Sequence, residues 1–388
     1  MTFRPILAAI LSSALLSASC AAGSTGDSAS ESTPAEAGLA IAEYGTFSEP
    51  WGAAFIPGTA LLFVTEKAGT ARIVDTAKAT PKLVTVSGLP KVDYGGQGGL
   101  GDVAFLPSES APTLARRTIY LSWAEAGPGD TRGAAVGRGT LSCAVADECT
   151  IEGLQVIWRQ PKVSGRGHYS HRLAFSPDGQ YLFVSSGDRQ KLDPAQDTAN
   201  NLGSIVRLNL DGTPAAGNAF TGQAGKAQDI WSYGHRNVLG LAFDAEGRLW
   251  DLEHGPAGGD EINLVTRGAN YGWPRVSDGD HYDGKPIPRH STSEAYARPA
   301  ISWNPVIAPG DFLFYSGRRF ADWKGQAIIA GLGSEGLVRV AFEGATAREL
   351  GRIPMGSRLR EIVEGPDGNL WVLEDGEEAR LLRLAPAS

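Results

Sequence analysis

The chain has 388 residues, of which 50 are Gly, 23 are Pro and 42% are hydrophobic. This hydrophobic fraction can form a core, so the composition excludes disorder over most of the length, and the many glycines indicate short elements joined by tight turns. The 35 Lys and Arg residues against 43 Asp and Glu residues give a net charge of −8, which argues against a general binder of nucleic acid or anionic membranes, because phosphate binding needs clustered positive charge.

Residues 1–20 have the features of an export signal. Arg4 is followed by an apolar stretch over residues 6–16, which is too short to span a bilayer. The small residues before Cys20 resemble a bacterial lipobox, so we expect either lipidation of Cys20 or ordinary cleavage close to it. Residues 21–38 are rich in Ser, Ala, Thr and Gly and predict a flexible linker. We therefore expect an exported protein, periplasmic or held to the envelope by a lipid anchor alone.

Over residues 39–388, short apolar strands recur in pairs around tight turns, as in RLAFSPDGQYLFVSSGD. Alternating strands that flank Pro-Asp-Gly or Glu-Gly turns predict β-hairpins. Copies of the pattern begin at Trp51, Leu100, Arg172, Gly240, Gly310 and Arg360. Six copies with no linker between them predict a single all-β domain, a six-bladed β-propeller. The alternative is a β-sandwich or two separate β-domains.

The second of these predicted blades is followed by two cysteines, Cys143 and Cys149, which lie close together in the sequence. In an exported chain such a pair indicates a disulfide that closes a small loop or hairpin. A metal pair is the weaker alternative, because no Cys or His lies near enough to complete four ligands.

Polar clusters occupy several long connections between the predicted strand pairs. They surround Gln97, His168, Arg236 and the segment EHGPAGGDEIN over residues 253–263. A propeller gathers such connections at one end of its central channel, so the clusters predict one site. A loop histidine such as His168 can act as a general base because its pKa lies near neutrality, although an isolated loop histidine is more often structural, and His171 could serve equally.

Charged groups in these clusters indicate ion binding. Arg236 is a permanently charged fork of donors suited to a carboxylate or an oxyanion, or it ties two blades together. The Gly-Pro and Gly-Gly turns near Asp260 and Glu261 offer the hard oxygen ligands that Ca²⁺ prefers, or they are turns with solvated acids. Arg358 and Arg360 alternate along a predicted strand, and two like charges on one face require an anionic ligand or neighbouring Glu residues.

Common cofactor and hydrolase motifs are missing from the sequence. No GxGxxG opens a helix, and there is no P-loop, Gly-x-Ser-x-Gly elbow or HExxH. This argues against a Rossmann-bound nucleotide, ATP use and zinc proteolysis.

Taken together, the segments resemble the soluble quinoprotein glucose/sorbosone dehydrogenases, a family that includes bacterial aldose sugar dehydrogenases. The matching motifs, in the family's order, are GQGGLGDVAF, HYSHRLAFSPDG, YGHRNVLGLAFD, EHGPAGGDEINLVTRGANYGWP and RLREIVEGPDGNLWVL. The resemblance implies a six-bladed β-propeller that uses pyrroloquinoline quinone (PQQ), held by Ca²⁺, to oxidise an aldose sugar at the anomeric carbon to its lactone. Electrons would pass to an external acceptor, for which a basic cytochrome c would suit the acidic surface.

The resemblance also implies roles for individual residues. His168 matches the general base, Asp260 the carboxylate near it, and Arg236 the group that stabilises charge on the reduced quinone. The other matches are Gln97, Asn237, Arg358 and Arg360 as cofactor contacts, Gly255 and Pro256 as carbonyl ligands of Ca²⁺, and Glu261 and Tyr271 as contributors to a second, structural Ca²⁺ site.

Two positions depart from the family pattern. Gly333 stands where a Lys is expected to reach the cofactor, so one cationic contact is missing. His171 occupies a position that is usually small, where it could narrow the pocket, shift the pKa of His168 or replace it as the base. These departures keep two other functions open: a non-catalytic β-propeller that binds a ligand or protein, and a Ca²⁺-dependent lactonase, which would need a carboxylate cage on the axis.

Overall fold

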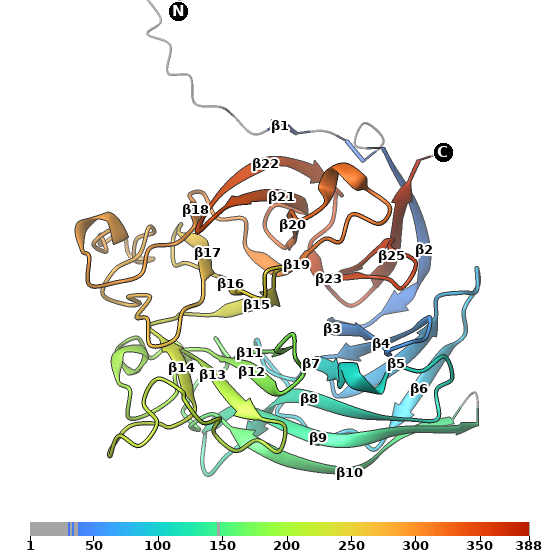
Figure 1. Ribbon diagram of the computed structural model, residues 1–388, viewed down its shortest axis with the longest axis horizontal. Coiled ribbons are helices and arrows are strands. Elements are labelled where there is room, and N and C mark those ends of the chain that lie inside the picture. The colour runs from blue at the N-terminus through green and yellow to red at the C-terminus, as the bar shows by residue number, and fades with distance from the viewer. Residues whose placement is uncertain (1–29, 32, 35–37, 146–147, 388) are drawn as a thin grey trace, which may run out of the picture.

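The computed structural model describes residues 30–31, 33–34, 38–145 and 148–387 (Figure 1). The predicted signal segment 1–20, including Cys20, lies outside the described residues. The described chain has 25 strands and no α-helix, which confirms the predicted all-β class. None of its helical segments could cross a membrane. Those segments are four 3-10 turns, Pro107–Glu109, Asp193–Gln196, His290–Thr292 and Ala321–Trp323.

Five sheets surround the centre of the molecule (Figure 1). The first, in the order β3-β4-β5-β6-β10-β9-β8-β7, contains β3 (Pro50–Phe55), β4 (Leu61–Glu66), β5 (Thr70–Asp75), β6 (Leu83–Ser87), β7 (Leu100–Phe105), β8 (Arg116–Ala126), β9 (Arg132–Val145) and β10 (Glu148–Arg159). The second sheet contains β11 (Ser170–Phe175), β12 (Tyr181–Ser186), β13 (Ser204–Asn209) and β14 (Ile230–Tyr233). The third sheet contains β15 (Val238–Phe243), β16 (Leu249–Glu253), β17 (Asp260–Leu264) and β18 (Ile301–Trp303). The fourth sheet contains β19 (Pro309–Phe314), β20 (Ala327–Gly331), β21 (Gly336–Glu343), β22 (Thr346–Pro354) and β1 (Ser30–Glu31). The fifth sheet contains β23 (Leu359–Glu364), β24 (Leu370–Glu374), β25 (Ala379–Pro386) and β2 (Leu39–Phe47).

The eight-stranded sheet consists of two antiparallel groups of four, joined where β6 and β10 run parallel through two residue pairs. At the other end of the chain, β2 pairs antiparallel with β25, so the N-terminal part of the domain completes the C-terminal sheet. Because two groups share one sheet, the sheets number five, and the count of six blades stays a prediction.

Two residues of the predicted flexible linker 21–38 have regular structure. Ser30–Glu31 forms β1, which pairs parallel with β22 opposite Gly351 and Arg352. The predicted linker therefore includes two residues in regular structure, and its flexibility stays a prediction. An edge strand such as β22 exposes unpaired backbone groups, and a passing polar segment can bond to them whatever its side chains are.

The structure joins Cys143 and Cys149 in a disulfide. The two residues are cross-strand partners in the β9–β10 hairpin. Cys149 also faces Val86 of β6 across the parallel junction. The disulfide therefore lies where the two halves of the eight-stranded sheet meet.

The inner strands bury both faces because each sheet lies between two others. In β12, Leu182 and Val184 pack toward the neighbouring sheet that includes Tyr120, whereas Phe183 between them packs with Leu241 of the next sheet. This is the side-chain alternation that a strand imposes. The preceding turn uses Gly179 at φ +68°, a left-handed conformation that glycine adopts without strain.

Arg172 of β11 is buried at the point where the first strands of all the groups meet. Its guanidinium lies 4.2 Å from the centroid of an aromatic ring and forms hydrogen bonds or ion pairs with groups from other strand groups. These partners are the ring of Trp51 in β3, the Asp102 carboxylate in β7 (3.5 Å), the Leu239 carbonyl in β15 (2.6 Å), the Gly310 carbonyl in β19 (2.9 Å) and the Glu361 carboxylate in β23. One side chain thus ties six strand groups together at the centre.

Candidate active site

A cavity of about 230 Å³ lies at the N-terminal ends of the first strands. Gln97 precedes β7, Asn237 precedes β15 and Arg358 precedes β23, and all three line it together with Arg360. The fold therefore brings four of the predicted cofactor contacts to one place from three different groups.

A smaller cavity adjoins the first and shares His254 with it. The predicted site residues that line it are Arg236, Gly255, Pro256, Glu261 and Tyr271. His168 and Asp260 line neither cavity, but each bonds to a residue that does. The His168 amide donates to the Gln97 side-chain oxygen at 2.6 Å, and Asp260 accepts from the Gly255 amide at 2.8 Å.

His168 is held by a carboxylate that the sequence analysis did not identify. Its Nδ1 lies 2.6 Å from Oδ1 of Asp188, and both side chains are buried. Asp188 also accepts from Trp273 Nε1 at 2.8 Å. Burial lowers the pKa of His168, although the Asp188 hydrogen bond opposes this. Burial disfavours the Asp188 carboxylate, yet the bonds from His168 and Trp273 keep its pKa below the ordinary value. The pair is thus a neutral imidazole oriented by an ionised carboxylate.

His171 lies in an apolar setting despite its closeness to His168 in the sequence. Its ring stacks on Trp51 with centroids 4.7 Å apart, and its Nδ1 lies 2.8 Å from the Ser122 hydroxyl. Gly101 makes this placement possible, because a Cβ there would lie 1.9 Å from the His171 ring. Burial lowers the pKa of His171 to about 3. A group with so low a pKa is a weak base, although the His171 ring lines the cavity.

Arg236 is positioned by its backbone and partly free at its side chain. Its amide donates to Glu253 Oε2 at 2.6 Å, and its guanidinium donates to the His254 carbonyl and to the Tyr282 hydroxyl, each at 3.1 Å. The Nε atom is buried and has no hydrogen-bond partner in the described chain. An unsatisfied buried donor beside a cavity is costly unless a ligand accepts from it.

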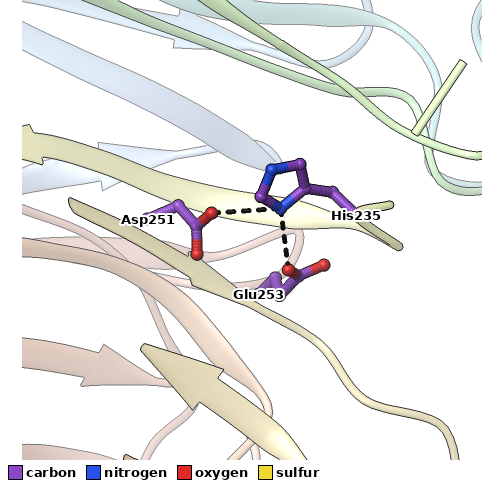
Figure 2. A group of neighbouring side chains, drawn as sticks. All are labelled: His235, Asp251 and Glu253. Carbon is purple, nitrogen blue, oxygen red and sulfur yellow. Dashed lines mark hydrogen bonds and ion pairs between the residues drawn. The ribbon is translucent and has the colours of Figure 1, made fainter. Parts of the chain in front are cut away.

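The residue before Arg236, His235, forms a buried group with Asp251 and Glu253 (Figure 2). Both carboxylates face the His235 ring, with Nδ1 3.1 Å from Asp251 and 3.0 Å from Glu253. Although burial opposes the charged ring, the two carboxylates raise the pKa of His235 to about 10. His235 is therefore an imidazolium at neutral pH, and it holds the carboxylate that in turn fixes the Arg236 amide.

Asp260 does not bond to His168. Its oxygens accept from the backbone amides of Gly255 at 2.8 Å and Ala308 at 2.7 Å. Burial raises its pKa to about 6 in spite of these bonds. Asp260, which the resemblance assigns a place next to His168, thus fixes the Gly255 turn, and Asp188 lies beside His168 instead.

The predicted Ca²⁺ ligands Gly255 and Pro256 are buried. None of the hydrogen bonds found among the described backbone groups ends on their carbonyl oxygens. Gly255 has no room for a side chain, since a Cβ would lie 2.2 Å from the Gly258 carbonyl oxygen. Buried carbonyls without partners suit a hard cation, so these two residues fit the Ca²⁺ that the resemblance implies.

Of the two residues predicted for a second Ca²⁺ site, Glu261 and Tyr271, the second already bonds to a histidine. The Tyr271 carbonyl lies 3.0 Å from Nε2 of the buried His290. Although burial opposes its charge, Asp278 and Glu261 raise the pKa of His290 to about 9. Glu261 is buried and its pKa is raised to about 8 by that burial. A histidine thus stands beside both predicted ligands, and the second Ca²⁺ site stays a prediction.

Arg358 and Arg360 share one counter-ion. Asp375 accepts from Arg358 Nε at 3.0 Å and from Arg360 Nη2 at 2.8 Å. The neighbouring Glu361 bonds to Arg172 instead. One carboxylate balances only one of the two guanidinium charges, so an anionic ligand would complete the balance.

Some residues of the site that the motifs did not indicate follow a simple positional pattern in the sequence. Asp188 follows the second strand of its hairpin, as do Gly255 in the next sheet and Asp375 in the last. The second strands end at the same edge at which the first strands begin, so residues after them reach the cavity. Trp273 gave no such signal, because its contact with Asp188 spans 85 residues.

The fold and this site define the class of protein. Rings of strand groups around a central cavity make a β-propeller, and the similar structures below share that fold. Residues 47–383 match the family model described as Glucose / Sorbosone dehydrogenase, so the chain belongs to that family of oxidoreductases. This confirms the resemblance that the motifs predicted.

Three relatives illustrate the similarity. Aldose sugar dehydrogenase YliI of Escherichia coli (strain K12) is 36% identical over 344 residues, covering 87% of this chain and 90% of the relative. The crystal structure of the soluble aldose sugar dehydrogenase from Escherichia coli in the apo-form has a TM-score of 0.82 at 33% identity, covering 90% of this chain and 99% of that one. The PQQ-bound form of aldose sugar dehydrogenase from Streptomyces coelicolor has a TM-score of 0.72 at 25% identity, covering 89% and 98%.

Proposed function

We propose that the chain is a PQQ-dependent aldose sugar dehydrogenase, which oxidises an aldose at the anomeric carbon to its lactone. The observation that carries the proposal is the buried His168–Asp188 pair, bonded through Gln97 to a cavity that also holds Arg358 and Arg360. A base that is bonded to a residue of an arginine-lined cavity suits a reaction that removes a proton next to an acidic cofactor. The PQQ-bound relative supports this choice of cofactor.

The residues of the cavity fit such a cofactor. PQQ carries three carboxylates, and Arg358 and Arg360 have one acid between them. Arg236, whose Nε has no partner in the described chain, lines the same small cavity as Gly255 and Pro256, whose carbonyls would hold Ca²⁺. When bound, PQQ would supply the two-electron acceptor for the hydride of the anomeric carbon.

The chain's own residues would handle the proton. Asp188 accepts a hydrogen bond from Nδ1–H of His168, which leaves Nε2 as the basic nitrogen. Burial keeps the imidazole neutral at pH 7, so it can accept the proton of the sugar's anomeric hydroxyl. The Gln97 side chain fixes the His168 backbone, and Asn237 accepts from Ser170 at 3.3 Å on the cavity wall.

We also propose the finer architecture and setting. Counting the eight-stranded sheet as two blades gives six, and the contacts that Arg172 of β11 makes with five other strand groups support that count. Residues 1–20 would direct export, with Cys20 as the point of a lipid anchor and residues 21–38 as the tether to a periplasmic domain over 39–388. The electrons would pass to an external acceptor such as a cytochrome c.

The test is reconstitution of the purified chain. Apoprotein is mixed with PQQ and Ca²⁺, and dye reduction is followed with a panel of aldoses. Turnover that His168→Gln abolishes, with PQQ still bound, is the expected result. No turnover and no shift in the quinone absorbance would reject the proposal in favour of a binding propeller. Hydrolysis of lactones without PQQ would instead indicate the lactonase.

A further inference from the structure

Lys67 occupies a position that the fold directs to the cavity. It follows directly after β4, the second strand of its group. The residues after the second strands of other groups, Asp188, Gly255, Leu332 and Asp375, all lie in or beside the site. Lys67 is the basic member of this set, and it lines the same cavity as Arg358 and Arg360.

The Lys67 ammonium is held in place at the cavity wall. Its Nζ lies 3.0 Å from Glu49 Oε1 and 5.8 Å from the centroid of the Tyr94 ring, and its side chain is 16% exposed. Tyr94 also donates to the second oxygen of Glu49. The Lys67 backbone is fixed as well, since its amide donates to the Glu49 carbonyl and its carbonyl accepts from Leu100.

The charges on this wall show why Lys67 matters. Three basic side chains line the cavity, Lys67, Arg358 and Arg360, and two acids pair with them, Glu49 and Asp375. The wall therefore has one positive charge in excess. Without Lys67 the two guanidinium groups and the two carboxylates would cancel, and the attraction for an anionic ligand would be lost.

Position 333 has little room for a side chain that could supply this charge. A Cβ on Gly333 would lie 2.9 Å from the Ala308 Cβ and 3.0 Å from the Ile307 carbonyl oxygen, and the Gly333 amide is bonded to that carbonyl at 2.9 Å. Because the loop packs closely around Gly333, the third basic side chain of the cavity comes from another strand group.

We propose that Lys67 is a carboxylate-binding residue of the cofactor site, which exchanges its bond to Glu49 for a bond to a carboxylate of PQQ. This inference rests on the proposed function. Because the ammonium is already ordered by Glu49 and Tyr94, little side-chain freedom is lost when it binds the ligand.

The experiment is a titration of apoprotein with PQQ at saturating Ca²⁺, followed by the change in quinone absorbance. Lys67→Met should weaken binding about ten- to hundredfold, the usual effect of losing a hydrogen bond to a charged group. It should also flatten the salt dependence of binding. Lys67→Arg should stay close to wild type. The matched control is Lys162→Met, since Lys162 pairs with Glu125 at 2.6 Å with similar exposure and lies outside the cavity lining.

Glu49→Gln provides a second variant that keeps the lysine. It removes one acid from the wall, so PQQ should bind more tightly than to wild type. If Lys67→Met and Glu49→Gln both bind PQQ as wild type does, Lys67 is not a ligand residue and the inference is wrong while the proposed function stands. If wild type itself fails to bind PQQ, the proposed function fails and the inference with it. If Lys67→Met does not fold, the Glu49→Gln variant decides alone: tighter PQQ binding supports the inference, and unchanged or weaker binding contradicts it.

Discussion

Replacing Asp188 by Asn tests the assignment of the proton acceptor most directly. The carboxylate accepts from His168 Nδ1 at 2.6 Å and from the Gln190 amide at 2.8 Å through Oδ1, and from Trp273 Nε1 at 2.8 Å through Oδ2. An amide has one oxygen and one NH₂ group, whereas all of these partners are donors. One of the two sides must therefore face an NH₂ group.

Either orientation of the amide has a measurable consequence. If the NH₂ group faces Trp273, a buried indole N–H loses its acceptor, at a cost of about 1–3 kcal/mol in stability, and His168 loses the carboxylate charge that raises its pKa, so it becomes a weaker base. If the NH₂ group faces His168, it donates to Nδ1 and forces the ring hydrogen onto Nε2, so the basic nitrogen is no longer available. Loss of a positioned general base lowers the rate about 10²- to 10⁴-fold.

The assay is kcat/KM of the reconstituted enzyme across pH, with PQQ binding and thermal unfolding measured on the same preparation. Wild-type activity should rise with pH through a pKa below 6.5 and then level off, because burial lowers the pKa of His168 and only the neutral ring is a base. Asp188→Asn should bind PQQ but turn over at least about 10² times more slowly. Asp178→Asn, in a surface turn, serves as the control. Activity of Asp188→Asn within about threefold of wild type, with the same pH profile, would refute the role of the pair.

Three further predictions concern the buried side chains of Arg172, His171 and His235. Arg172→Met should lower the free energy of unfolding by about 3–5 kcal/mol, since it leaves Glu361 and its neighbours buried without their cation; an unchanged denaturant midpoint would contradict the central contact. The pKa of His171 is lowered to about 3 in the folded chain, so between pH 6.5 and 3 only the unfolded chain binds a proton at this ring. The free energy of unfolding should therefore fall by about 1.4 kcal/mol per pH unit from this group as the pH drops through that range. His171→Asn should lack that part of the acid slope. His235 has its pKa raised to about 10, so its contribution is complete below pH 6.5 and is lost as the pH rises toward 10; the melting temperature of wild type should fall over that range, and that of His235→Asn should fall less.

Much of the fold could be predicted because its signals are local. The turn at Gly179 and the alternation of Leu182, Phe183 and Val184 follow from a few neighbouring residues, and these fix a hairpin wherever it lies. Repetition of that pattern then indicated an all-β ring. The pairing of Ser30–Glu31 with β22 could not be predicted in this way, because it depends on an exposed strand edge rather than on the segment's own composition.

By itself the sequence determined the all-β class, the family and the segments that reach the site, since each depends on short motifs. Only the tertiary structure decided which partners meet within that site. Asp188 meets His168 across 20 residues, Arg172 meets Glu361 across 189, and Lys67 reaches the wall that holds Arg358. Such contacts form when closure of the ring brings the ends of separate strands to one axis. No local pattern encodes which acid will then lie beside which base, because the pairing depends on the positions of all the strand groups at once.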